Sequence, residues 1–448
     1  MRKTHPTEQS AADAAPISCT STCPRKAGWL EERLQLSAFQ EKYGHKAFPV
    51  HSTFFLGETA AISFLILVVT GIYLGLIYTP SISEISVAGQ RLPEAFASVQ
   101  LIESIPAANL IRNVHHWAAH VMIAAILLHA FRVFFTGTYR KPRELTWLLG
   151  VLLLGMTLAA GFVGYGLPWD AFAVTATGIG FGLARSIPVV GHVLGDLFFG
   201  GAFPSLGSLP RLYTIHVVVI PLSILGVMSL HLLLVLKQKH SMPGYAKKLA
   251  EPGKVLGISL WPNHALLAGQ LLFLMLGGLS LLAAFVPVHP LAAYGPPTPE
   301  TPAVKPDWYL LWIFGFLKLI PAGVGMTLGP VTIGPEFLGG VLFPASVIGA
   351  MTLVPWLDRT NRRVLRRFEY LEPPPQAPLR LALGVGALAF VAMLLFASYY
   401  DQIGLTLGQI WLLVLSLPVV VAAAIFSWSW VTRQRRGSVA RFDPTSDA

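Results

Sequence analysis

Residues 112–132 read RNVHHWAAHVMIAAILLHAFR, an apolar stretch that holds His115 and His129 at a 14-residue spacing. A second stretch, residues 211–231, reads RLYTIHVVVIPLSILGVMSLH and holds His216 and His231 at a 15-residue spacing. A histidine inside a membrane helix is costly without a partner, so it indicates a functional site. Fourteen residues of helix rise roughly 21 Å, against about 30 Å for a hydrocarbon core. The two pairs therefore define two levels, one near each membrane face.

The composition is that of a polytopic membrane protein. Hydrophobic residues make up 54% of the chain and charged residues 12%, whereas soluble domains are about 25% charged. Eight apolar segments are near the ~20 residues that a spanning helix needs. They cover residues 54–79, 113–135, 146–167, 211–236, 264–287, 336–356, 380–400 and 408–431. An all-α integral membrane fold with eight transmembrane helices is expected.

Basic residues set the expected orientation. The two termini and the second, fourth and sixth loops hold 24 of the 32 lysines and arginines. The positive-inside rule then places both termini in the cytoplasm. The net charge of +10 reflects topology and lipid contact, and it gives no support for nucleic-acid binding. Neither Cys19 nor Cys23 is followed by the His of a C-x-x-C-H haem-attachment motif. On the cytoplasmic side they are expected to be reduced thiols; the alternative is a metal shared with a partner.

The spacing of the histidines is matched by glycines on two other spans. Fourteen residues at ~100° each leave two imidazoles within about 40° of one helix face. The 15-residue pair is rotated further, and a kink at Pro221 is expected to absorb the extra residue. Glycine lets a flat macrocycle approach the backbone. The glycines with the same 14-residue spacing are Gly57 with Gly71 and Gly150 with Gly164.

Two arginines complete the pattern. Arg112 precedes His115 by three residues and Arg132 follows His129 by three, each on its histidine's face, where a guanidinium can bind haem propionates. Bundle cores are usual sites for such cofactors. The sequence therefore predicts a four-helix bundle around two bis-histidine haems. We call His115 with His216 the outer pair, and His129 with His231 the inner pair. His116 and His120 are interpreted as structural or interfacial.

The chain resembles cytochrome b of the quinol-oxidising cytochrome bc and bf complexes over roughly residues 45–430. The motifs that carry the resemblance are RNVHHW…LLHAFR, TGTYRKPRELTW, GYGLPWD, RLYTIH…H and PDWY at 306–309. The resemblance implies two non-covalent b haems, the outer one bound by the outer pair and the inner one by the inner pair. It also implies quinol oxidation at the outer face, with electron bifurcation to a Rieske iron–sulfur protein and to the haems, and quinone reduction near the cytoplasmic face, which builds a proton gradient.

The resemblance also implies residues for the two quinone sites. Quinol oxidation would involve the Gly164–Tyr165–Pro168–Trp169 region, the stretch 172–187, and Pro306, Asp307, Trp308 and Tyr309. Asp307 is a candidate proton acceptor because burial can raise a carboxyl pKa; the alternative is a loop-capping carboxylate. His264, in the segment WPNH, is a candidate proton donor for quinone reduction; the alternative is an interfacial helix cap. Lys42, His45, His51 and Lys237 share that surface and are not ranked.

The sequence departs from the family pattern at several positions. Asp307 stands where the family most often has Glu, and His264 where the bf branch has Asp. The 15-residue spacing, PRELTW and GYGLPWD resemble the bf branch, whereas the unsplit chain and the eighth span resemble the bc branch. Phe55 occupies the place of the bf cysteine that attaches a further haem, so a covalent third haem is not expected.

Three regions are expected along the chain. Residues 1–45 form a cytoplasmic tail with a surface amphipathic helix at 27–43, residues 46–240 the four-helix dihaem domain, and residues 241–448 a C-terminal membrane domain. The last contains the quinol-site loop 288–335. The resemblance implies a bacterial plasma-membrane protein that works with a Rieske protein, a c-type cytochrome acceptor and quinone, in a homodimer of the complex.

Two other functions remain open on the residues alone. A linear dihaem membrane anchor of a dehydrogenase needs only four or five spans, and it leaves the Pro306–Tyr309 loop and the extra helices unexplained. A haem-free proton-coupled transporter leaves the matched glycine spacing unexplained.

Overall fold

The computed structural model describes residues 33, 37, 40–238, 240–244, 246, 256–288, 291, 294–298, 304–329, 331–358 and 370–442. Eight helices in this part of the chain are long and apolar enough to cross a membrane, which confirms the predicted number. They cover Ser52–Gly75, Pro106–Phe135, Glu144–Tyr165, Ser208–Gln238, Leu260–Phe285, Glu336–Leu357, Pro378–Ala397 and Leu407–Gln434. Most of the predicted 27–43 helix lies outside the described residues. Cys19 and Cys23 both lie outside them.

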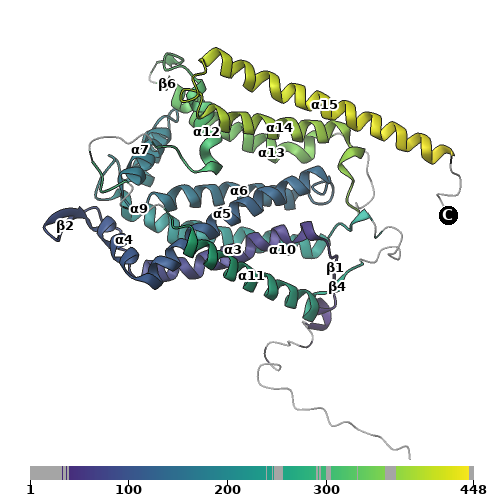
Figure 1. Ribbon diagram of the computed structural model, residues 1–448, viewed down its shortest axis with the longest axis horizontal. Coiled ribbons are helices and arrows are strands. Elements are labelled where there is room, and N and C mark those ends of the chain that lie inside the picture. Colours follow the sequence, from purple (N-terminus) through teal and green to yellow (C-terminus); the bar gives the residue numbers. More distant parts are fainter. Residues whose placement is uncertain are drawn as a thin grey trace, which may run out of the picture.

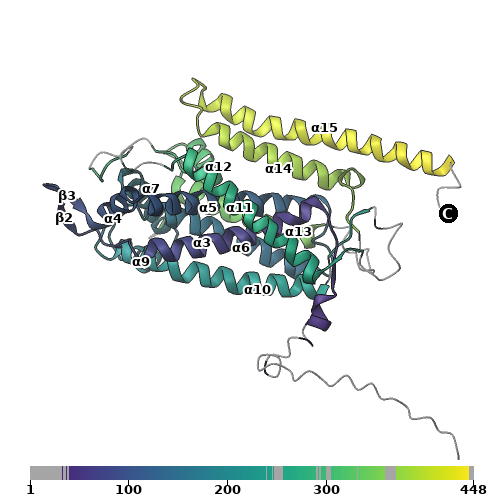
Figure 2. The same cartoon turned by 60° about the horizontal axis from the view of Figure 1, so that its bottom comes forward.

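Four helices form an N-terminal bundle: α3 (Phe55–Gly75), α5 (Pro106–Phe135), α6 (Glu144–Tyr165) and α10 (Ile220–Gln238). They run side by side, and α11 (Ala265–Phe285) packs on α5 (Figures 1 and 2). Phe64, Met122 and Ile224 are buried together, each about midway between the two glycines or histidines of its helix. This apolar layer separates two levels of the bundle and explains why the spans read as continuous hydrophobic runs.

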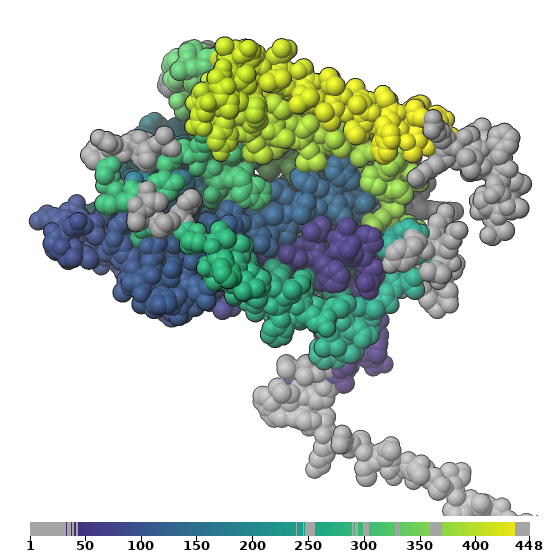
Figure 3. Space-filling model, viewed as in Figure 1, coloured from purple at the N-terminus to yellow at the C-terminus, as the bar shows by residue number. Residues whose placement is uncertain are grey.

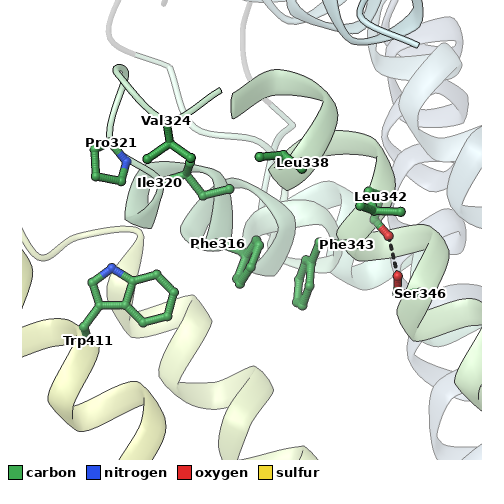
Figure 4. A pocket seen from close by; sticks show the side chains of 9 residues that line it. All are labelled: Phe316, Ile320, Pro321, Val324, Leu338, Leu342, Phe343, Ser346 and Trp411. Carbon is green, nitrogen blue, oxygen red and sulfur yellow. Dashed lines mark hydrogen bonds between the residues drawn. The ribbon is translucent and has the colours of Figure 1, made fainter. Parts of the chain in front are cut away.

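The C-terminal helices cover one side of the bundle (Figure 3). Helices α14 (Pro378–Ala397) and α15 (Leu407–Phe442) form an antiparallel pair over α12 (Trp308–Leu319) and α13 (Phe343–Leu357), which follows the π-helical turn η7 (Glu336–Leu342). Between α12, η7, α13 and α15 is an apolar hollow of about 450 Å³. Its lining residues, with Phe316 stacked on Phe343 at 3.7 Å, are shown in Figure 4. None of the predicted site residues lines it.

The two ends of the molecule carry different short elements. One, the α4 end, holds the hairpin β2 (Glu84–Val87) and β3 (Gln90–Pro93), α4 (Glu94–Ser104), α7 (Ala171–Arg185), α8 (Gly191–Phe199), α9 (Ser208–Thr214) and the hairpin β5 (Met326–Leu328) and β6 (Val331–Ile333) (Figures 1 and 2). The other, the β1 end, holds the turns η1 (Gln40–Gly44), η2 (Ser52–Phe54), η5 (Leu260–His264) and η9 (Pro374–Gln376). It also holds the antiparallel ladder of β1 (Ala47–Phe48) with β4 (Ile258–Ser259).

Basic residues at the β1 end also join the two halves of the chain. The guanidinium groups of Arg140 and Arg380 both donate to Oε2 of Glu372 at 2.7 Å. Nearby, Tyr139 donates to Oδ2 of Asp358 at 2.7 Å, and burial together with that carboxylate raises the pKa of Tyr139. These contacts link the loop after α5 to the segment that precedes α14.

The extra residue between His216 and His231 is absorbed before Pro221, in a different way from the predicted kink. Residues Ile215–Val219 form a π-helical turn, η3, between α9 and α10. A π turn inserts one residue into an α-helix, so the residues that follow keep the phase of the 14-residue spacing. Proline lacks the N–H that would tighten the next turn, which is compatible with this opening.

Candidate functional site

The two histidines of the outer pair lie opposite each other inside the bundle. His115 on α5 and His216 in η3 have ring centroids 6.3 Å apart and an interplanar angle of 67°. Histidine–metal bonds are about 2 Å long, so two imidazoles on opposite sides of one ion have centroids roughly 6 Å apart. The observed separation of 6.3 Å would leave room for one metal ion between the two rings.

The inner pair lies at the opposite level of the same two helices. His129 lies on α5, and His231 on α10 is near enough to interact with it electrostatically. Nδ1 of each ring is buried and makes no hydrogen bond among the described residues; the backbone of Thr146 lies near His231 without reaching ordinary hydrogen-bond geometry. In the outer pair both Nδ1 atoms have partners: Thr70 Oγ1 lies 2.8 Å from His115 Nδ1, and the Ala160 carbonyl 3.1 Å from His216 Nδ1.

Each of the four glycines faces one of the four histidines. A methyl group built on the glycine lies 3.2 Å from Cε1 of His115 for Gly71 and 3.2 Å from Cε1 of His129 for Gly57. The corresponding distances are 2.7 Å between Gly164 and His216, and 3.5 Å between Gly150 and His231. The glycines therefore make room for the imidazoles as they lie between the helices, in addition to the space for a macrocycle that the sequence suggested.

The two arginines flank the pairs at opposite ends of α5. Arg112 contacts Glu103 of α4 at 3.2 Å. The guanidinium carbon of Arg132 lies 4.2 Å above the Phe54 ring, and its Nε is buried with no hydrogen bond among the described residues. Each arginine is one turn nearer its end of the molecule than the neighbouring histidine.

The PDWY segment gathers the predicted quinol-oxidation residues at the α4 end. Helix α12 begins at Trp308, and the Asp307 side chain does not cap it, so the loop-capping alternative does not describe this carboxylate. Instead Tyr309 Oη donates to Asp307 Oδ2 at 3.2 Å. Tyr165 of α6 also interacts with Asp307. Burial, followed by Asp307 and Tyr165, raises the pKa of Tyr309.

The stretch 172–187 packs beside the same loop. It forms most of α7, whose N-cap Asp170 accepts from the Ala173 amide at 2.7 Å. Phe172 contacts Tyr165 at 5.7 Å and Tyr294 at 5.2 Å between ring centroids. Segments from both halves of the chain thus meet at this end.

His120, which the sequence suggested to be structural, contacts the PDWY segment directly. Trp308 Nε1 donates to His120 Nδ1 at 2.8 Å, and His120 Nε2 lies 3.0 Å from His116 Nε2. The helix that carries His115 is thereby joined to the start of α12. The pairing is between residues 188 positions apart, and no local pattern signals it.

At the β1 end His264 pairs with a residue that the sequence did not single out. Its Nε2 lies 2.7 Å from Oε1 of Glu58, in the first turn of α3. His240, also not predicted, lies between Phe48 and Phe54. Burial, then Arg132, His264 and Arg143, lower its pKa to about 4. His51 instead caps η2, where its side chain accepts from the Thr53 amide.

Comparison with known sequences identifies the family. Residues 120–296 match the model described as "Cytochrome b(N-terminal)/b6/petB", and residues 296–373 match that of the cytochrome b C-terminal/b6/petD domain. The chain is 35% identical over 393 residues to the cytochrome bc1 complex cytochrome b subunit of Streptomyces coelicolor, covering 84% of this chain and 70% of the relative. The chain belongs to the cytochrome b family.

Other relatives agree. The cytochrome bc1 complex cytochrome b subunit of Mycobacterium leprae is 31% identical over 434 residues, covering 90% of this chain and 76% of its own length. A solved structure titled "Hyperthermophilic respiratory Complex III" shares the fold, with a TM-score of 0.64 at 23% identity over 89% of this chain and 99% of that one. Family membership implies b haem as cofactor and replaces the two alternatives left open by the residues alone.

The residues present fit a b haem. The outer imidazoles are far enough apart to hold a metal ion between them, and the glycines leave the space that a Cβ would fill. At the inner level, Nδ1 of His129, Nδ1 of His231 and Nε of Arg132 are buried and make no hydrogen bond within the part of the chain that the structure describes.

Proposed function

We propose that this chain is the subunit of a quinol:cytochrome c-type oxidoreductase in which quinol is oxidised at the α4 end and quinone is reduced at the β1 end. Electrons would divide between a Rieske iron–sulfur protein and the haem chain. The single observation that carries the proposal is the facing outer pair, His115 and His216 at 6.3 Å, with a second histidine pair at the other level of the same helices. When bound, two b haems supply one-electron carriers at two depths of the membrane.

The chain's own residues would hold those cofactors. The outer pair would bind one haem and the inner pair the other, each through two imidazoles. Arg112 and Arg132 would neutralise propionates, because a guanidinium binds a carboxylate bidentately. The four glycines would keep the ligand rings in place, since a side chain there would crowd the facing imidazole.

Asp307 would accept a proton from quinol. Its Oδ2 already accepts from Tyr309, which fixes the carboxylate beside Tyr165. The raised pKa of Tyr309 keeps its phenol protonated, so Tyr309 can donate a hydrogen bond but does not compete as a base. Pro306 and Trp308 would line the quinol, and His264 would take part in quinone reduction at the β1 end.

The proposed topology follows from charge. Among the described residues, Arg140, Arg143 and Arg380 lie at the β1 end, which would be cytoplasmic with both termini, and the α4 end would face outward. The four-helix domain 46–240 would hold the haems and residues 241–448 the quinol loop. A Rieske protein, a c-type cytochrome acceptor and a second copy of the complex are the proposed partners.

The test uses the purified complex. Pyridine haemochrome analysis should give two non-covalent b haems per chain, resolved as two potentials in a redox titration. No haem would overturn the proposal, and one haem would mean that one histidine pair is wrongly assigned.

Substitution of Asp307 tests its role as the proton acceptor. D307N should slow quinol-driven haem reduction about 10²-fold or more, because a general base is typically worth that much, with both haems retained. D307E should keep most of the rate. Unchanged kinetics in D307N would remove Asp307 from the mechanism.

A further inference from the structure

Glu58 and His264 form a half-buried side-chain pair close to the inner histidines. His264 Nε2 lies 2.7 Å from Glu58 Oε1, and the two side chains are 16% exposed for His264 and 28% exposed for Glu58. They come from the start of α3 and from η5, which are far apart in the sequence. Titratable side chains that are partly withdrawn from water are often paired or functional.

The surroundings hold the pair in place. Phe48 lies 4.6 Å from the His264 ring and 4.7 Å from the His240 ring, between centroids. The β1–β4 ladder pairs Phe48 with Ile258, two residues before η5 begins. An extended strand near the N-terminus therefore fixes the aromatic ring against which His264 packs.

The pair is also next to the inner level. Gly57, the neighbour of Glu58, faces the His129 ring at 3.2 Å. The second carboxyl oxygen, Glu58 Oε2, is buried and makes no hydrogen bond among the described residues. Leaving a buried acceptor without a partner is costly, so this oxygen is placed to accept a further hydrogen bond.

We propose that Glu58 supplies protons through His264 to the quinone that is reduced at the β1 end. This rests on the proposed function, which provides the site and its one-electron donor, the inner b haem. Glu58 is a proton-supplying residue that acts through His264, and His264 is the group that touches the quinone.

The proton balance closes. Nδ1–H of His264 breaks and an O–H bond forms on the quinone, while His264 Nε2 takes the proton of the Glu58 carboxyl. A hydronium ion on the cytoplasmic side reprotonates Glu58, and exchange with water, which gives a proton to Nδ1 as it takes the one on Nε2, returns the ring to its first tautomer. Two such transfers, with two electrons that arrive singly, convert one quinone to quinol.

The test separates this step from quinol oxidation. In the purified complex, the b haems are first reduced by quinol, and their reoxidation is then followed after mixing with menadione or a short-chain ubiquinone, whichever the wild type accepts. E58Q keeps the shape and the bond to His264 but carries no transferable acid proton. Reoxidation should slow about 10- to 100-fold, as expected for loss of a general acid, while haem reduction by quinol stays unchanged.

Further variants exclude a structural role. E58D should recover most of the reoxidation rate, and added formate should partly rescue E58Q, which a packing defect would not allow. E144Q is the matched control, because Glu144 is likewise the acidic residue in the first turn of a spanning helix. Reoxidation by E58Q at the wild-type rate, or loss of a haem in E58Q and E58D alike, overturns the proposal. Failure of quinol to reduce haem in the wild type would instead overturn the proposed function.

Discussion

The outer and inner histidine pairs use the same side chains on the same helices but differ in what lies behind the rings. Nδ1 of His115 and His216 meets Thr70 Oγ1 and the Ala160 carbonyl, whereas Nδ1 of His129 and His231 makes no hydrogen bond among the described residues. Partners behind a ligating histidine fix its orientation and raise its basicity. Two haems held by otherwise identical histidine pairs would therefore differ in electronic character.

The expected sign of the difference in reduction potential follows from the charge on the haem iron. A more basic imidazole stabilises the ferric state and lowers the reduction potential. The outer position should then have the lower potential and the inner position the higher one. Electron transfer from the α4 end to the β1 end would run downhill in free energy.

The largest expected effect comes from Gly164 and Gly150, the α6 glycines, whose clearances from the facing histidines differ between the levels. G164A places a methyl group 2.7 Å from His216 Cε1, while G150A places one 3.5 Å from His231 Cε1, an ordinary contact. G164A should lose or displace the outer haem and stop quinol-driven reduction, and G150A should keep both haems. Haem content and optical spectra of the purified complexes measure haem loss or displacement. Identical spectra for the two variants would contradict the predicted difference between the two levels.

A smaller effect is expected from the partner behind His115. T70V removes the hydroxyl at 2.8 Å from Nδ1, and a hydrogen bond worth about 1 kcal/mol corresponds to a potential change on the order of 40 mV. The outer potential should rise by up to that amount and the inner one should not move. T59V is the control, since Thr59 donates to Phe55 in its own helix. Equal shifts at both potentials would contradict the assignment.

The smallest expected effect concerns His120 and the quinol loop. H120F removes the acceptor of the Trp308 indole, a partly exposed bond, so quinol oxidation should slow only about threefold, chiefly in kcat. H120N keeps an acceptor near the Nδ1 position and should retain the wild-type rate. Reoxidation of haem by quinone, which belongs to the other end, serves as the internal control. If H120N slowed quinol oxidation as much as H120F does, His120 would act by packing and not as a hydrogen-bond acceptor.

The sequence predicted features that repeat with a helical period and missed those that depend on long-range contacts. The eight spans and the pairs of histidines and glycines follow from hydropathy and 14-residue spacing. The bonds of Trp308 with His120 and of Glu58 with His264 join distant segments, and nothing around either residue marks its partner. The two-residue ladder of Phe48 with Ile258 is too short to show alternation, and His240 lies outside every span.

The π turn at Ile215–Val219 has a consequence for how such chains are compared. Counted along the sequence, His216 and His231 are out of step with His115 and His129 by one residue; counted by rotation about the helix axis, they are in step. A sequence alignment therefore shows a one-residue insertion at this point, although the orientation of the two rings about the helix axis is unchanged. Deleting Val218 would turn the bulge into a regular helix with the same ligand spacing as α5, and both rings would still face the same side.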